Sequence, residues 1–202
     1  MRRKCRSIVL PDLAVTTPVD SPIPNATGTI GLAVNGLQAR AAGLESDWAA
    51  FLDRLRADGH EPVLISNEWS TDQPLWPTIQ GTMPVRSTGR DLDYAGYAAL
   101  LGSFDIVISS RLHTCVLALC AGTYVIPVET GTFKLSGFFS QIGLPDAAIP
   151  LNVSGWGDQI LARLAAYRDD PSPLESQLAA RDAAREELLT RLRPRLRSML
   201  EQ

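Results

Sequence analysis

The side chains best suited to chemistry lie in one turn, Ser110-Arg111-Leu112-His113. The guanidinium of Arg111 offers a planar fork of donors that matches a carboxylate or a phosphate. The imidazole of His113 can donate a proton or, as a cation, hold a phosphate. The competing interpretation is a surface arginine and a histidine satisfied by a backbone carbonyl, and spacing alone does not decide between the two.

Weaker candidates follow the neighbouring apolar runs. Lys134 comes shortly after one of them, where Thr130 and Gly131 could also bring backbone N–H groups close to a phosphate. Asn35 follows the first run and could reach the same edge of a sheet. On spacing alone, a solvated helix lysine is the favoured interpretation of Lys134, and a loop cap that of Asn35.

Two residues of the loop that follows the second apolar run could contact a sugar, Trp69 by stacking and Asp72 by hydrogen bonding. Turn and packing roles explain both at least as well. His60 lies in a connection at the opposite edge of the expected sheet, so we assign it no function.

Strands that alternate with helices must position these residues. Apolar runs predict strands at 29–34, 61–66, 105–109 and 124–128, and weaker ones at 7–10, 83–87 and 147–151. Helices are expected at 47–57, 75–80, 92–101, 133–142, 157–167 and 174–200, and one more directly after Arg111. Ser46 is expected to be the N-cap of the helix at 47–57, and Asp91 that of the helix at 92–101. Pro194 should kink or divide the last helix.

This alternation predicts an α/β fold: a Rossmann-like layered domain with a mostly parallel sheet and helices on both faces. Arg111 and His113 then lie at the carboxyl end of a strand and at a helix N-terminus, where an anion is favoured. Residues 1–28, with three prolines in 16–28, are expected to form an N-terminal tail and linker. Residues 29–202 should form the domain, including the final helix.

Composition argues against several classes of protein. The 202 residues are 45% hydrophobic with a formal net charge of −3, which argues against nucleic-acid binding through bulk electrostatics. Three cysteines and two histidines show no disulfide or metal-ligand spacing, so we expect no metal. No apolar run approaches the roughly 20 residues of a membrane span, so a cytoplasmic protein is expected, whose basic ends could touch the inner face of a membrane. The sequence also lacks the GxGxxG motif of dinucleotide-binding enzymes, the Walker loop of P-loop enzymes and the GxSxG motif of α/β-hydrolases.

The segment FDIVISSRLHTCVLALCAGTYVIPVETGTFK resembles the C-terminal signature of the polysaccharide pyruvyl transferase family. Its S-R-L-H turn, small-residue helix, V-P-V-type strand and following lysine carry the resemblance. Looser similarity covers TIGLAVNG, DGHEPVLIS, Gly143-Leu-Pro145 and Pro11-Asp-Leu-Ala14. The resemblance implies that residues 7–200 form the donor-binding half of a two-domain, GT-B-like enzyme.

By this resemblance, the protein transfers pyruvate from phosphoenolpyruvate to two hydroxyls of a glycan or lipid-linked sugar, as a ketal, without a further cofactor. Arg111 would clamp the carboxylate or phosphate. His113 would act as general acid at the vinyl carbon or bind the leaving phosphate. The further binding residues implied are Ser110, Leu112, Lys134, Thr130, Gly131 and Asn35.

The sequence departs from this family in one respect, because the glycine-rich N-x-G-D-type opening of the N-terminal domain is missing. A separate N-terminal half or a homo-oligomer is therefore an expected partner, and activity of the chain alone is left open. Two alternatives remain: half of a GT-B glycosyltransferase that binds a nucleotide sugar, and a non-catalytic interaction module that uses the leucine stripe of the final helix, Leu188, Leu189, Leu192, Leu196 and Leu200.

Overall fold

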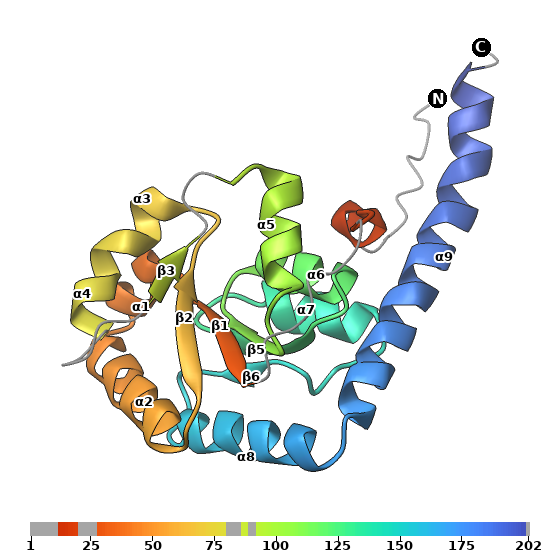
Figure 1. The fold of residues 1–202 in the computed structure, drawn as a ribbon. Coiled ribbons are helices and arrows are strands. Elements are labelled where there is room, and N and C mark those ends of the chain that lie inside the picture. Colours follow the sequence, from red (N-terminus) through yellow and green to blue (C-terminus); the bar gives the residue numbers. More distant parts are fainter. Residues whose placement is uncertain (1–11, 20–27, 80–85, 89–91, 201–202) are drawn as a thin grey trace.

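One parallel sheet organises the computed structural model, which describes residues 12–19, 28–79, 86–88 and 92–200 (Figure 1). Within these ranges the sheet has six strands in the order β3-β2-β1-β4-β5-β6. The strands are β1 (Thr29–Ala33), β2 (Glu61–Ile65), β3 (Arg86–Thr88), β4 (Ile106–Ser109), β5 (Tyr124–Glu129) and β6 (Ile149–Pro150). All neighbours pair in parallel, which confirms the predicted α/β class. The predicted strand at 7–10 lies outside the described residues.

The central strands are buried on both sides. Every residue of β1 and of β4 is buried, and Gly31 pairs with Val107, which in turn pairs with Val125 of β5. Unbroken apolar runs are typical of strands that are covered by helices on both faces. The sequence therefore shows continuous hydrophobic segments rather than an alternating pattern.

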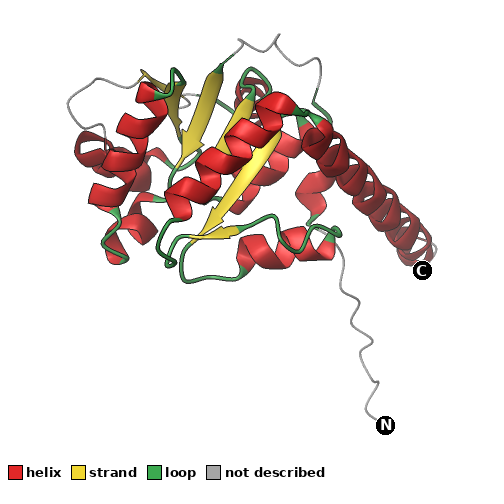
Figure 2. Ribbon diagram, turned by 90° about the horizontal axis from the view of Figure 1, so that it is seen from below, coloured by secondary structure: helices red, strands yellow, loops and turns green. Residues whose placement is uncertain are grey.

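Helices cover the two faces of the sheet as separate layers (Figure 2). One layer packs its side chains with Ile30 and Leu32 of β1 and consists of α1 (Gly36–Ala41), α2 (Glu45–Ala57), α4 (Trp76–Ile79) and α8 (Trp156–Asp169). The other packs with Val107 and Val125 and consists of α5 (Tyr94–Leu101), α6 (Leu112–Cys120), α7 (Lys134–Gln141) and α9 (Ser172–Leu200). A short 3-10 turn, η1 (Leu13–Thr16), lies against α6 and α9 with Val15 buried in this second core.

Several predicted helix boundaries were wrong. Ser46 does not cap α2, which begins at Glu45 after Leu44, because a tight turn with Gly43 at φ +66° leads directly out of α1. The cap of α5 is Asp93, whose carboxylate accepts from the backbone N–H of Gly96 at 2.7 Å. The predicted cap Asp91 lies outside the described residues. Two helices were not predicted at all: α1 and α3 (Trp69–Asp72), which continues into the 3-10 turn η2 (Gln73–Leu75).

The final helix is continuous through Pro194 and is not divided. Strong helix formers, mainly leucine and arginine, flank the proline on both sides and support one helix across it. Leu188 is fully buried and Leu192 packs against the second core, so this part of the leucine stripe binds the chain's own domain. Beyond it, α9 projects past the body of the domain (Figure 1).

Gln177 of α9 closes an open part of the sheet edge at β5. Its side-chain oxygen accepts from the backbone N–H of Val125 at 2.9 Å, and its amide donates to the Val125 carbonyl at 2.7 Å. Gln177→Ala should lower the free energy of unfolding by about 1–3 kcal/mol, because two buried backbone groups lose their partners. Urea denaturation measures this, with the exposed Gln159→Ala in α8 as the matched control. Equal losses in the two variants would rule out this role.

The buried thiol of Cys115 makes the free energy of unfolding depend on pH in the alkaline range. Burial raises the pKa of Cys115 from its ordinary value of 9.0 to about 12. The unfolded chain loses this proton at a lower pH than the folded chain. The stabilisation is therefore complete below pH 9.0 and is lost as the pH rises towards about 12. Urea midpoints should fall more steeply above pH 9.0 for the wild type than for Cys115→Ala; parallel slopes would contradict this assignment.

Candidate functional site

A pocket of about 260 Å³ lies where β1, β4 and β5 end at their carboxyl edge. We call it the edge pocket. Its walls come from the segments that follow β1, β2, β4 and β5, and they consist of Asn35, Gln38, Asn67, Glu68, Ser110, Arg111, Leu112, His113, Thr132, Lys134 and Leu135. Among the predicted site residues, the structure brings together Asn35, Ser110, Arg111, Leu112, His113 and Lys134.

The turn from β4 into α6 is pinned by hydroxyl groups. Ser110 accepts from the backbone N–H of Asn35 at 2.7 Å, and Ser109 accepts from that of Arg111 at 2.9 Å. Arg111 occupies the N-cap position of α6 without a side-chain capping bond. The first N–H groups of a helix have no partner within the helix, so the N-terminus of α6 offers donors and a positive dipole end at the pocket.

Carboxylates from the segment after β2 hold the guanidinium of Arg111. The Asp72 carboxylate pairs with the Nε–Nη2 edge of the guanidinium: Nε donates to Oδ2 at 2.8 Å, and Nη2 donates to Oδ1. Nη1 donates to Glu68, and Nη2 also donates to Thr71 at 2.8 Å. The fork expected to clamp an anion is thus occupied by Asp72. Four of the five N–H groups of the guanidinium therefore have acceptors among the described residues. The second N–H of Nη1 has none.

Asp72 has a structural role here and does not face a sugar. It is fully buried and accepts from the Ser66 hydroxyl at 2.6 Å and the Gly36 N–H at 3.0 Å. Burial alone would lower the pKa of Arg111, but the hydrogen bonds and charge of Asp72, followed by those of Glu68, raise it above its ordinary value. Arg111 therefore stays charged, and its charge is offset by two acidic neighbours.

His113 projects from the first turn of α6 with 61% of its side chain exposed. Its Nε2 lies 3.6 Å from the carboxylate of Asp12, in the segment before η1. An imidazole in this position can hand a proton to a ligand in the edge pocket or form an ion pair with Asp12 when protonated. The geometry is compatible with both roles considered for His113 from the sequence.

Lys134 is the first residue of α7, and its exposed side chain lines the edge pocket. No carboxylate among the described residues pairs with its ammonium group. Glu129, at the end of β5, instead caps α7 by accepting from the N–H groups of Leu135 at 2.8 Å and Ser136 at 3.3 Å. Lys134 is thus a cation that remains available to an anionic ligand.

Two predicted residues lie away from the edge pocket. Thr130 is buried and donates to the side chain of Gln38 at 3.2 Å, and Gly131 is exposed with φ +62°. Asn35 lines the pocket and also caps α1 by accepting from the N–H of Gln38 at 3.1 Å, the loop-capping role favoured from spacing.

Sequence reasoning missed several wall residues. Asn67, Glu68, Gln38 and Thr132 were not proposed as site residues, although the first two and Thr132 lie in the segments that follow β2 and β5, and Gln38 lies in the helix that follows β1. Asp12 was noted only as part of a diffuse resemblance. The available signal was position alone, since polar residues after parallel strands gather at one edge.

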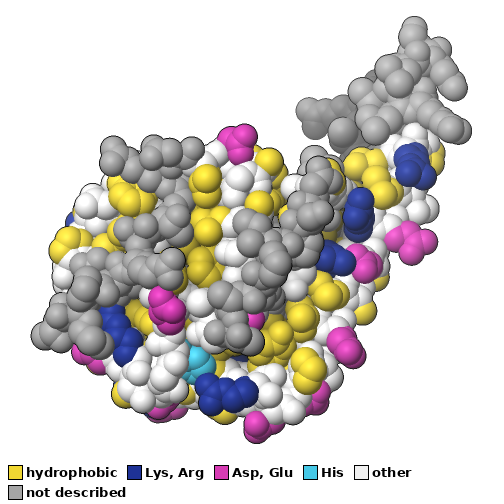
Figure 3. Space-filling model, viewed as in Figure 1, with side chains coloured by type: hydrophobic (Ala, Val, Ile, Leu, Met, Phe, Trp, Pro, Cys, Tyr) yellow, Lys and Arg dark blue, Asp and Glu magenta, His cyan; other side chains and the backbone are white. Residues whose placement is uncertain are grey.

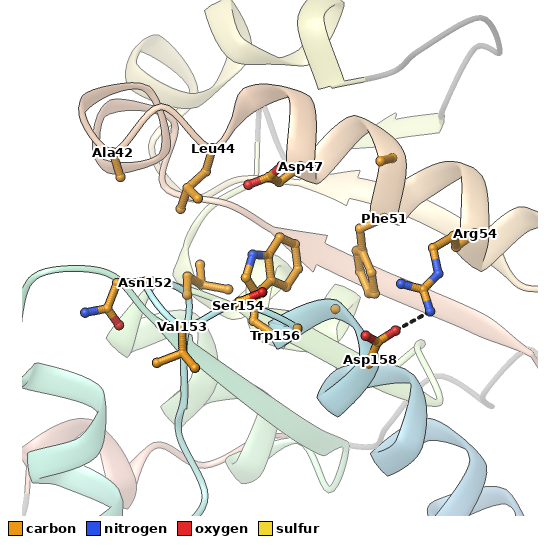
Figure 4. A pocket seen from close by; sticks show the side chains of 14 residues that line it. Ala42, Leu44, Asp47, Phe51, Arg54, Asn152, Val153, Ser154, Trp156 and Asp158 are labelled. Carbon is orange, nitrogen blue, oxygen red and sulfur yellow. Dashed lines mark hydrogen bonds and ion pairs between the residues drawn. The ribbon is translucent and has the colours of Figure 1, made fainter.

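A larger hollow of about 710 Å³ lies between α2 and the loop that precedes α8 (Figure 4). Asp47, Phe51 and Arg54 of α2 face Asn152–Trp156 and Asp158 across it. Its cation, Arg54, pairs with Asp158, and none of the predicted site residues lies in it. The edge pocket is therefore better suited to a small anion.

On the face in Figure 3, basic and acidic side chains are intermixed along α9. Among the described residues, no three His, Cys, Asp or Glu side chains lie close enough together to hold a metal ion. No helix within those ranges has both the length and the apolar character needed to cross a bilayer.

Comparisons with known proteins identify a family. A family model described as polysaccharide pyruvyl transferase matches residues 1–132, a range that contains the turn with Arg111 and His113 but ends before Lys134. No curated protein matches the sequence. The chain is similar to the crystal structure of the glycosyltransferase VinC in complex with DTDP, at 20% identity and a TM-score of 0.46, over 93% of this chain and 44% of VinC.

It is also similar to the glycotransferase of kitacinnamycin, at 14% identity and a TM-score of 0.48, over 90% of this chain and 43% of that one. The chain thus spans less than half the length of each of these two structures.

Proposed function

Because the chain belongs to the polysaccharide pyruvyl transferase family, we propose that the edge pocket binds phosphoenolpyruvate and that the protein transfers its pyruvyl group to a saccharide. The observation that carries the proposal is the convergence of Lys134, His113 and the α6 N-terminus on one small pocket. Its volume of about 260 Å³ lies just below the roughly 300–1,000 Å³ of pockets for drug-sized ligands, which suits a compact metabolite.

The charges of the pocket match the donor. Phosphoenolpyruvate carries a phosphate and a carboxylate. Lys134 and the N–H groups of α6 supply donors for one of them, and Nη1 of Arg111 supplies a donor for the other. Asp72 fixes the orientation of Arg111, so the guanidinium acts here through its outer edge rather than through its full fork.

The chemistry requires one proton to be delivered to the donor. Two hydroxyl oxygens of the sugar form bonds to C2 of phosphoenolpyruvate, the C2–O bond to phosphate breaks, and the methylene carbon becomes a methyl group. Of the two hydroxyl protons released, one ends on that methyl group and the other on the leaving phosphate. His113, exposed at the wall of the pocket, is our candidate for the group that relays a proton.

We further propose a partner for this unit and a cellular location. We propose that a second α/β unit, from an N-terminal half or another copy of the chain, completes the cleft over the edge pocket, as in a GT-B arrangement. The reaction is placed in the cytoplasm, at the inner face of the membrane when the acceptor is lipid-linked. No cofactor is needed, since phosphoenolpyruvate supplies both the pyruvyl group and the leaving group.

Calorimetric titration tests the donor assignment. Phosphoenolpyruvate should bind to the chain, while UDP and GDP should not. Lys134→Ala should weaken binding about tenfold, which corresponds to about 1.4 kcal/mol for the loss of one charge-assisted contact. Arg193→Ala, an exposed cation on α9, is the matched control. Binding of a nucleotide but not of phosphoenolpyruvate would sink the proposal and favour the glycosyltransferase alternative.

A further inference from the structure

A second hollow, of about 470 Å³, adjoins the edge pocket. The loop after β2 forms one wall, the start of α5 another, and η1 together with α6 the third. Asn67 and His113 line both hollows, so the two spaces meet at these side chains. A ligand in the second hollow would therefore lie beside a ligand in the edge pocket.

The lining of this hollow is aromatic and carries no cation. Trp69, Tyr94 and Tyr97 contribute rings, and neither arginine nor lysine is among its lining residues in the described ranges. The edge pocket, in contrast, contains Lys134 and Arg111. Two adjoining hollows of opposite character suit two different ligands, an anion in one and a neutral molecule with apolar faces in the other.

Polar groups with free hydrogen-bonding capacity stand at the rim. Asp93 uses Oδ1 to cap α5 by accepting from Gly96, and no described residue donates to its Oδ2. Asn67 uses its oxygen to accept from Thr114 at 3.4 Å, and no described residue accepts from its amide group. The Tyr94 hydroxyl shares a hydrogen bond of 3.0 Å with Thr17 and keeps further capacity. A carboxylate, an amide and a phenol next to aromatic rings match the hydroxyls and C–H faces of a sugar ring.

We propose that this aromatic hollow binds a pyranose ring of the saccharide acceptor, with its hydroxyls turned towards His113 and the edge pocket. The proposal rests on the proposed function, which places the donor on the other side of His113. It assigns a part of acceptor recognition to this α/β unit itself. The acceptor hydroxyls and the donor then meet at the one exposed imidazole that lines both spaces.

Saturation-transfer difference NMR with a panel of methyl hexopyranosides tests this site. At least one glycoside should receive saturation from the wild-type chain. Tyr94 is 53% exposed, so Tyr94→Ala should cost little stability. This variant should bind the glycoside at least tenfold more weakly, and Asn67→Ala should weaken glycoside binding as well. Asn152→Ala, an exposed asparagine in the larger hollow, is the matched control and should bind like the wild type.

Phosphoenolpyruvate titration of the same samples separates this proposal from the proposed function. Tyr94→Ala should bind phosphoenolpyruvate as the wild type does, because Tyr94 does not line the edge pocket. If no glycoside binds, or if Tyr94→Ala and Asn67→Ala bind glycosides normally, the sugar site is refuted while the donor assignment stands. If glycosides bind as expected and phosphoenolpyruvate does not, the donor assignment fails instead.

Discussion

Asp72→Ala should lower the free energy of unfolding by about 3–5 kcal/mol, the usual cost of breaking a buried ion pair by removing one partner. The Arg111 side chain, 9% exposed, would lose the carboxylate that faces both its Nε and its Nη2. The N–H of Gly36 and the hydroxyl of Ser66 would lose their acceptor as well. Urea denaturation followed by circular dichroism measures the loss.

The matched control is a second aspartate that pairs with arginine on the surface. Asp158 pairs with Arg54, and the two side chains are 70% and 51% exposed. Exposed pairs contribute about 0–1 kcal/mol, so Asp158→Ala should be close to neutral. If Asp72→Ala were as mild as this control, the buried network around Arg111 would not be a structural anchor.

This network also affects how mutations of the site are read. Arg111→Ala would leave Asp72 buried and unpaired, so a loss of ligand binding in that variant would reflect damage to the fold as well as to the pocket. Lys134 and His113 are exposed, and neither holds a fully buried carboxylate, which makes them the cleaner positions for testing ligand binding.

Glu68→Gln should strengthen phosphoenolpyruvate binding about ten- to hundredfold, the second large effect that we expect. The exposed carboxylate of Glu68 accepts from Nη1 of Arg111 and lines the edge pocket. An anion that binds the remaining N–H of Nη1 would lie close to this carboxylate and be repelled by it. Repulsion between unit charges about 5 Å apart is roughly 0.8 kcal/mol in bulk water and about 3 kcal/mol at the effective dielectric constant of a protein surface. The expected gain of about 1.4–2.7 kcal/mol lies within this range.

Titration calorimetry at low ionic strength is the appropriate measurement, since salt screens the repulsion. Glu175→Gln, an exposed glutamate at the start of α9, removes the same charge far from the pocket and should leave the affinity unchanged. An unchanged or weaker affinity in Glu68→Gln would mean that the anion does not approach Arg111 at all.

The strands could be predicted because their signal is local. β1, β2, β4 and β5 lie within one or two residues of the predicted runs at 29–34, 61–66, 105–109 and 124–128. Each contains a short apolar run of the kind that is typical of strands covered on both faces. The parallel order then placed the Arg111–His113 turn at the carboxyl edge without further information.

The helices α1 and α3 could not be predicted because their signal is tertiary. Asn35-Gly36 reads as a turn, yet Asn35 caps a helix that starts at Gly36. A side chain at position 36 would place its Cβ 2.6 Å from the carbonyl oxygen of Thr71, so the glycine permits α1 to pack closely against α3. Nothing in the residues next to Gly36 shows that approach.

The role of Asp72 was hidden for the same reason. Its partners Gly36 and Arg111 are 36 and 39 residues away along the chain. From spacing, Arg111 was a candidate donor for an anion, with a surface arginine as the competing interpretation. The structure shows that its guanidinium pairs with the protein's own carboxylate, Asp72. A turn can be located from sequence, but the partners of its side chains depend on how the strands are ordered.

The most direct test of the donor assignment is a titration of the ¹⁵N-labelled chain with phosphoenolpyruvate, followed in two-dimensional ¹H–¹⁵N NMR spectra. We expect the largest shifts at the backbone amides of Leu112 and His113, at the N-terminus of α6, and at Lys134. No shift at these amides, or shifts confined to residues 151–157 around the larger hollow, would contradict the placement of the donor in the edge pocket.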